Sequence, residues 1–226
     1  QNRYEPLRSA FGPFVGETTF ISQCNLMVEG PADQILLAGA TSYLRKLQDV
    51  PESQMLDLNR ITIVPCGGSP NLPYMVYLAR GRDTDKPAVI VLLDSDVDGN
   101  KAKTELTKDG PHPGKKAVLA DRFILQLGDV SVAKKEKGAG NASESEPFIV
   151  LEDLVPLALS VRAARNFLKI LFDLSDEQMS NLTDETVNNN RKNGESYFTT
   201  LKGLIHEIQP VGSYDIDKVP FARTVV

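Results

Sequence analysis

The sequence is poor in the residues that build several common kinds of functional site. It has only two histidines, His112 and His206, which argues against a histidine-rich zinc site. It also has only two cysteines, Cys24 and Cys66, each inside or beside an apolar run. We therefore expect buried free thiols in a reducing, cytoplasmic compartment rather than a disulfide. No apolar run approaches the length of a membrane span, and no signal-peptide pattern opens the chain.

Positive charge and nucleotide-binding motifs are also scarce. The formal net charge of the 226 residues is −5, so any contact with nucleic acid must come from local groups of lysine and arginine. No G-x-x-x-x-G-K-[ST] motif occurs, which excludes nucleotide binding through a P-loop. Hydrophobic residues make up 41% and allow a sizeable core. The chain begins at Gln1 without a methionine, and we expect it to be a fragment of a larger protein.

The first half of the chain alternates between strand-like and helix-like segments. Short apolar runs predict strands at 25–29, 60–65 and 86–96. Segments with helical spacing of apolar residues follow each of them, at 33–47, 71–80 and 98–108. Strands and helices that alternate in this way form a parallel sheet with right-handed crossovers. The sequence therefore predicts an α/β fold.

The second half follows a different pattern. We predict a fourth strand at 122–127, a mobile loop rich in Lys, Glu, Gly and Ser at 134–147, and a short strand at 148–151. Helices are predicted at 156–171, 176–190 and 194–208. This change of pattern places a boundary near residue 155, with a sheet domain at 1–155 and a helical appendage with a C-terminal tail at 156–226.

Carboxylates gather where the predicted strands end. Asp94, Asp96 and Asp98 follow the apolar run at 88–93, and Glu29 stands at the end of the first strand. Open α/β sheets bind their ligands at the carboxyl ends of the strands, and like charges this close repel unless a cation sits among them. Mg²⁺ or Mn²⁺, which prefer oxygen ligands, are the natural candidates.

Other interpretations of these acidic residues stay open. The segment from Asp94 to Glu105 satisfies the EF-hand pattern D-x-D-x-D-G-x5-E, although it follows a strand-like run rather than a helix and has Lys101 at its usually apolar eighth position. The cluster could also be a solvated turn. Glu29 could equally cap the next helix, and Asp33 could interact with the dipole of that helix.

Three further features allow both a functional and an ordinary structural interpretation. Gly67-Gly68-Ser69 could bring backbone N–H groups to a phosphate or form a plain turn. Glu152 and Asp153 follow a strand-like run and could supply metal ligands or cap a helix. Lys218 lies in a late segment that we interpret as a loop, where a lone lysine is usually only solvated.

The order of the strand-end motifs resembles the Toprim domain shared by topoisomerases, bacterial primases and several nucleases. Its signature is a strand-end Glu followed by a strand-end Asp-x-Asp, here Val28-Glu29-Gly30 and Leu93-Asp94-Ser95-Asp96-Val97-Asp98-Gly99. Finer points are similar to the OLD (overcoming lysogenization defect) family of nucleases: an acidic Asp33 four residues after Glu29, the later Val150-Leu151-Glu152-Asp153, and Lys218-Val219-Pro220-Phe221-Ala222. The resemblance covers about residues 22–155 well.

The resemblance implies a metal-dependent endonuclease that hydrolyses phosphodiester bonds of DNA with two Mg²⁺ or Mn²⁺ ions and low sequence specificity. The resemblance also implies that these sites can bind Ca²⁺. Glu29 and Asp33 would join Asp94 at one ion, Asp96 and Glu152 would help to hold the second, and Lys218 would lie near the metals. The resemblance also implies an N-terminal ABC-type ATPase domain as partner in the full-length protein, and no membrane partner.

The sequence leaves two alternatives to the nuclease open. One is another Toprim enzyme, a primase-like or topoisomerase-like module, although the tyrosine-bearing and zinc-binding modules these need are not visible. The other is a non-catalytic module that binds Ca²⁺ or Mg²⁺ through Asp94–Glu105. Binding to DNA would come mainly from contacts to phosphates that weaken as salt increases. The candidate residues for these contacts are Arg45, Lys46, Lys101, Lys103, Lys115, Lys116, Arg162 and Arg165.

Overall fold

The computed structural model describes most of the chain outside its N-terminal segment. The described residues are 22–47, 50–80, 87–108, 117–129, 148–208 and 216–226. The predicted loop at 134–147 lies outside them. No helix among the described residues is long and apolar enough to cross a membrane.

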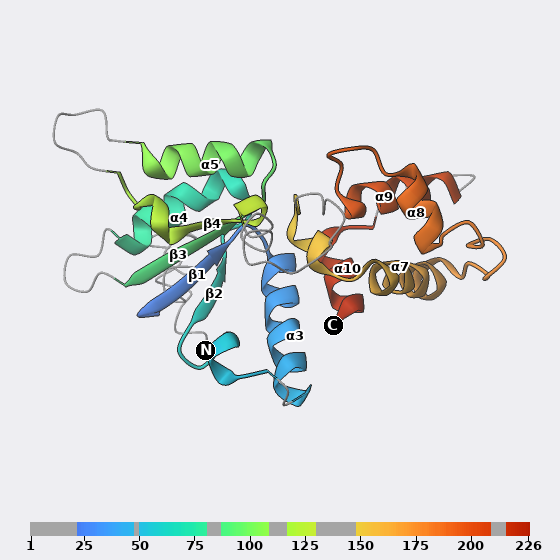
Figure 1. Ribbon diagram of the computed structural model, residues 1–226, viewed down its shortest axis with the longest axis horizontal. Coiled ribbons are helices and arrows are strands. Elements are labelled where there is room, and N and C mark those ends of the chain that lie inside the picture. Colours follow the sequence, from blue (N-terminus) through green and yellow to red (C-terminus); the bar gives the residue numbers. More distant parts are fainter. Residues whose placement is uncertain (1–21, 48–49, 81–86, 109–116, 130–147, 209–215) are drawn as a thin grey trace, which may run out of the picture. The chain divides into compact units, whose positions relative to one another are not determined.

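A four-stranded sheet forms the centre of the first half, as the alternating pattern predicted (Figure 1). Its strands are β1 (Cys24–Val28), β2 (Thr62–Pro65), β3 (Ala88–Leu93) and β4 (Ile124–Gln126), in the order β2-β1-β3-β4. β1 pairs in parallel with both β2 and β3, with Met27 opposite Val64 on one side and Val91 on the other. The prediction of a parallel α/β sheet is therefore confirmed.

The described chain divides into two compact units. The first unit comprises residues 1–30, 44–93 and 97–125, and the second comprises residues 31–43, 94–96 and 126–226. These units interleave along the sequence. The boundary expected near residue 155 instead divides the chain into two continuous segments, and it remains a prediction.

In the first unit, two helices cover one face of the sheet (Figure 1). They are α4 (Leu72–Arg80) and α5 (Val97–Thr107), which contact each other as well as the strands. Leu72 and Leu106 are fully buried against Met27 and Leu93 of the strands. Burial of such side chains is the main force that holds the sheet and the helices together. Short 3-10 turns lie at η1 (Glu52–Gln54), η2 (Ser69–Asn71) and η3 (Asp121–Phe123).

The second unit is mainly helical. Its helices are α7 (Leu157–Phe172), α8 (Asp184–Asn190), α9 (Tyr197–Ile208) and α10 (Lys218–Val225), together with the first part of α3 (Pro31–Leu47), which continues into the first unit. The apolar faces of α7, α8, α9 and α10 meet in one core, in which the ring centroids of Phe198 and Phe221 lie 4.9 Å apart. The predictions at 156–171 and 194–208 agree with α7 and α9, whereas the prediction at 176–190 is confirmed only over α8.

Two predicted elements are wrong. Residues 148–151 form no strand, because the Asp153 carboxylate accepts the backbone N–H groups of Ile149 and Val150, and the chain then turns into η4 (Leu151–Leu154). Lys218 is not in a loop but is the first residue of α10. Pro220 fits there because the first turn of a helix does not need its N–H group.

Candidate functional site

The acidic motifs follow neighbouring parallel strands. Glu29 is the first residue after β1, and Asp94 is the first residue after β3. The register Met27 to Val91 brings both strands to their carboxyl ends at the same edge of the sheet. The expectation that these two strands are neighbours is therefore confirmed, and this edge is where parallel sheets place ligands.

In the first unit, the turn after β2 holds Glu29. The Gly68 N–H donates to the Glu29 carbonyl oxygen at 2.7 Å, and the Ser69 hydroxyl donates to Oε2 of the Glu29 carboxylate. Gly67 and Gly68 have φ values of 77° and 113°, a left-handed conformation that side chains other than hydrogen rarely allow. The Gly-Gly-Ser motif thus forms a special turn that contacts an acidic residue of the predicted site.

In the second unit, two buried carboxylates share one ammonium group. Lys218 Nζ lies 3.4 Å from Asp94 Oδ2 and 3.1 Å from Glu152 Oε2. The side chains of Asp94 and Glu152 are 6% and 0% exposed, whereas that of Lys218 is 42% exposed. We call Asp94, Glu152 and Lys218 the acid–lysine cluster. It joins residues from three distant parts of the sequence.

Charge dominates the environment of Lys218. Burial alone would lower the pKa of its ammonium, but the negative charges of Glu152, Asp94 and Asp33 raise this pKa above its ordinary value. Asp33 is buried in the first turn of α3, so it adds negative charge to the same region of the second unit. Three of the predicted metal ligands, Asp33, Asp94 and Glu152, therefore act on one cation.

Backbone contacts fix the position of Asp94. Its Oδ1 accepts the N–H of Leu151 at 3.1 Å, and the Ser95 N–H donates to the Ile149 carbonyl at 2.7 Å. These bonds tie the Asp-x-Asp motif to the segment that carries Glu152. Gln126 also donates to the Asp94 carbonyl at 3.4 Å. The contact between Asp94 and Leu151 was not predicted, because these residues are 57 positions apart and meet only through tertiary structure.

Glu152 and its neighbour Asp153 have different roles. Asp153 accepts three backbone N–H groups, from Ile149, Val150 and Tyr197, so it holds η4 to the start of α9. In contrast, the charged partner of the buried Glu152 carboxylate is the Lys218 ammonium, 3.1 Å from Oε2. A buried carboxylate is costly unless a cation balances its charge, and here the Lys218 ammonium does so. The carboxylate oxygens of Asp94 and Glu152 are of the kind that divalent metals bind, but Lys218 lies beside both of them.

Asp96 and Asp98 lie outside the acid–lysine cluster. Asp96 is half-buried and directly precedes α5, while Asp98 is exposed and pairs with Lys101 at 2.9 Å. Because residues from Val97 onward form α5, the segment Asp94–Glu105 cannot wrap around an ion as an EF-hand loop does. The calcium-loop interpretation is therefore wrong, and Glu105 is an exposed residue of a helix.

No group of three or more His, Cys, Asp or Glu side chains is arranged to hold a metal ion within the described part of the chain. In the second unit, the Lys218 ammonium stands between the two closest carboxylates, Asp94 and Glu152. Glu29 belongs to the first unit, where Ser69 is its hydrogen-bond donor. The full ligand set of Glu29, Asp33, Asp94, Asp96 and Glu152 remains a prediction.

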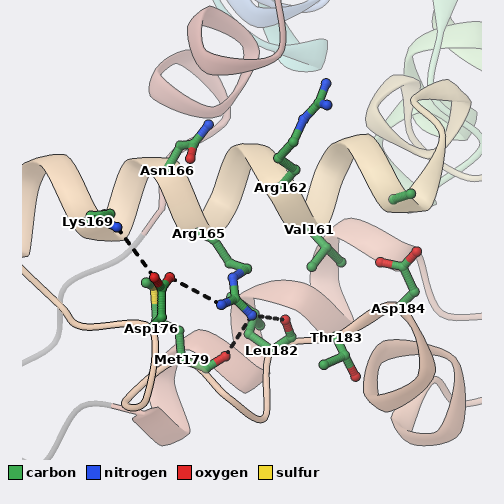
Figure 2. Close-up of a pocket in the computed structure, with 11 residues that line it drawn as sticks. Val161, Arg162, Arg165, Asn166, Lys169, Asp176, Met179, Leu182, Thr183 and Asp184 are labelled. Atoms are coloured by element: carbon green, nitrogen blue, oxygen red, sulfur yellow. Dashed lines mark hydrogen bonds and ion pairs between the residues drawn. The ribbon is translucent and has the colours of Figure 1, made fainter.

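Several lysines and arginines that were candidates for DNA contacts have partners within the protein. Figure 2 shows Arg165 of α7 pointing toward the segment after this helix, where it donates to the carbonyls of Met179 and Leu182 and to Asp176. The hydrogen bond from Arg165, together with nearby Lys169, lowers the pKa of Asp176. Arg162 extends away from this group (Figure 2) and remains the better candidate for a phosphate contact on α7.

The parallel sheet, with acidic residues after two adjacent strands, is consistent with a Toprim-like α/β fold. Residues 20–96 match the family model described as overcoming lysogenization defect protein-like, TOPRIM domain. This segment is thus similar to the Toprim domain of OLD-like proteins, as its motifs predicted. No curated protein gives a significant match to the chain.

Two solved structures are similar to this chain. One is the C-terminal region of the Xanthomonas campestris pv. campestris OLD protein, with 18% identity, a TM-score of 0.47, and coverage of 92% of this chain and 84% of that one. The other is the C-terminal region of the Burkholderia pseudomallei OLD protein, with 15% identity, a TM-score of 0.44, and coverage of 91% and 87%.

Proposed function

We propose that this protein is a divalent-metal-dependent endonuclease that hydrolyses phosphodiester bonds in DNA. The observation that carries the proposal is the acid–lysine cluster, in which two buried carboxylates surround a single cationic group. Structural ion pairs are usually found on the surface, where they cost little. Buried acidic groups beside the Asp-x-Asp motif of a Toprim domain instead suit the binding of metal ions.

The carboxylates would hold the metal. Asp94 and Glu152 are the central metal ligands of this proposal, and Asp33 adds negative charge from α3. Glu29 and Asp96 are the remaining ligands, assigned from the sequence. When bound, a pair of Mg²⁺ or Mn²⁺ ions would act as Lewis acids on the phosphate group. The buried position of Asp94 and Glu152 limits the competition of water for these oxygens, which strengthens their attraction for a cation.

Lys218 would act on the substrate rather than on the metal. Its side chain is half exposed at the edge of the cluster, so its ammonium can reach an incoming phosphate. In the transition state, negative charge grows on the phosphoryl oxygens, and a positioned cation stabilises that charge. The neighbouring carboxylates outweigh the lowering effect of burial on the pKa of Lys218, so its ammonium stays protonated at neutral pH, as this role requires.

DNA and an N-terminal ATPase domain are the partners that the proposal includes. Contacts to phosphates from groups such as Arg162 would give binding that weakens as salt increases and that depends little on base sequence. The P-loop motif of an ATPase is absent from this sequence, so ATP-dependent control would come from another part of the full-length protein.

A plasmid-nicking assay tests the proposal. Wild-type protein should nick supercoiled DNA with Mg²⁺ or Mn²⁺ and lose this activity in EDTA. Asp94→Asn should abolish nicking while the protein stays folded, because the amide oxygen can still accept the Leu151 N–H while the charge is lost. Glu105→Gln on exposed α5 is the matched control and should cut like wild type. Full activity in EDTA, or an active Asp94→Asn variant, would contradict the proposal.

A further inference from the structure

The second unit contains an apolar groove with a volume of about 560 Å³. The residues that line it come from α3, from η4 and the segment after it, from α7 and from the end of α10, and all of them belong to this one unit. Leu36 and Leu151 of the lining are buried, whereas Tyr43 and Leu154 are 62% and 43% exposed. Sites for small molecules have a comparable size and a mainly apolar lining, with a few polar groups that orient the ligand.

Gly39 of α3 shapes this groove. A Cβ atom at Gly39 would overlap the side chain of Val226, which also lines the groove. Glycine is disfavoured inside a helix, and here its lack of a side chain allows the residue after α10 to lie directly against α3. The groove is therefore formed by a close contact between two helical segments of the same unit.

Arg162 is the only charged side chain among the described residues that line the groove. It is exposed, it makes no hydrogen bond or ion pair with a described residue, and Figure 2 shows it extending away from the group around Asp176. A guanidinium can bind a carboxylate through two parallel hydrogen bonds. One guanidinium balances the single charge of a carboxylate, whereas a phosphate monoester carries nearly two charges at neutral pH.

We propose that this groove binds a small amphipathic carboxylate, whose apolar body lies against the leucines of the lining and whose charged end pairs with Arg162. Asp94, Glu152 and Lys218 do not line the groove, so this site is separate from the acid–lysine cluster. The inference goes beyond the proposed nuclease activity and does not depend on it. It gives Arg162 a partner other than a DNA phosphate.

Calorimetric titration of decanoate into the full chain in EDTA, below the micelle concentration of decanoate, tests the charged end of the site. Wild type should bind decanoate at one site, and Arg162→Gln should weaken this binding about tenfold, the scale of one hydrogen bond between charged groups. The uncharged 1-decanol should bind both proteins alike. Arg223→Gln, at an exposed arginine of α10 outside the groove, is the matched control and should bind decanoate like wild type.

A second pair of variants tests the apolar part of the site. Ala40 is exposed on α3 and lines the groove, so the indole of Ala40→Trp should fill it and abolish the binding of decanoate and of 1-decanol. Ser42→Trp adds the same side chain at an exposed position of α3 outside the groove and should bind both ligands like wild type. Leu154→Ser removes an apolar side chain from the lining and should weaken both ligands, which keeps the test open if Ala40→Trp does not fold.

Three outcomes would overturn the inference. Wild-type affinity for decanoate in Ala40→Trp or in Leu154→Ser would mean that the ligand binds elsewhere. Unchanged decanoate affinity in Arg162→Gln would remove the role of the carboxylate. A wild-type dimer that Leu154→Asp converts into a monomer, seen by sedimentation, would make the groove an interface between two copies of the chain. Because the titrations contain no divalent metal, loss of the nicking activity would leave this site unaffected.

Discussion

Lys218 can affect catalysis in two ways, by balancing the charge of the carboxylates and by contacting the substrate phosphate. Measuring metal affinity and nicking rate in the same variant distinguishes these effects. Lys218 stands between Asp94 and Glu152, so it both balances their charge and can meet a phosphate. Lys218→Ala should lower the nicking rate by roughly 10²-fold, the effect of losing one preorganised charged donor. Its Mg²⁺ affinity should not fall, because an ammonium competes with the metal for these carboxylates instead of binding it.

Replacement of Lys218 by arginine refines this prediction. Lys218→Arg keeps the charge, but its planar guanidinium is larger than an ammonium and should rescue the rate only partly. Nicking rates under single-turnover conditions and calorimetric Mg²⁺ titrations of the same protein samples provide the measurements. A wild-type rate in Lys218→Ala would mean that Lys218 is an ordinary surface lysine.

The raised pKa of Lys218 also predicts how stability depends on pH. The unfolded lysine titrates near pH 10.4, and the folded one above this value, so the ion pairs contribute fully below about pH 10.4. Their contribution is lost as the pH rises through the folded pKa. In EDTA, the difference in urea midpoint between wild type and Lys218→Met should therefore shrink at strongly alkaline pH. A difference that stays constant to the highest pH at which both proteins fold would contradict this assignment.

The candidate ligands differ in how readily the sequence identifies them. Glu29, Asp94 and Asp96 could be found because each stands just after an apolar strand, a position where parallel sheets place ligands. The contact of Glu152 with Lys218 could not be found in this way, because it depends on tertiary packing. Ser69 was visible as part of a Gly-Gly-Ser motif, but only the folded turn shows that its hydroxyl meets Glu29.

Among the elements, η4 depends most on one side chain. Asp153 accepts the N–H groups of Ile149 and Val150 through one oxygen and that of Tyr197 through the other. Asp153→Asn replaces one acceptor oxygen by a donor and leaves at least one buried N–H without a partner. It should lower the free energy of unfolding by about 1–3 kcal/mol, measured by urea denaturation. Asp98→Asn, an exposed acidic residue on α5, should change it by less than about 0.5 kcal/mol.

The elements that the sequence mispredicted share a physical cause. The apolar run at 148–151 looks like a strand, but a local carboxylate binds its N–H groups before they can join the sheet. The start of α10 contains Pro220, which usually suggests a break, yet the first helical turn accepts proline. In both cases the local chemistry of one residue outweighed the average propensity of the segment. The strands β1 to β3 were predictable because their burial requires continuous apolar runs.

At the scale of the whole molecule, we expect the segment 134–147 to be dispensable for folding. Its composition, rich in Lys, Glu, Gly and Ser, cannot bury much apolar surface. A short Gly/Ser linker in its place should shift the melting temperature by only a few degrees, as recorded by calorimetry. Loss of cooperative unfolding in this variant would show that the segment contributes to the core.

The interleaving of the two units has a consequence for protein synthesis. The chain enters the second unit at Pro31, leaves it after Tyr43, and returns briefly at Asp94–Asp96 before it stays there from Gln126 onward. A ribosome therefore completes the first unit while Asp94 still lacks both Glu152 and Lys218. Since domains generally fold as the chain emerges, the nascent protein carries an incomplete acid–lysine cluster until α10 has been made. Under the proposed function, the protein would therefore lack part of its catalytic cluster while it is still being translated.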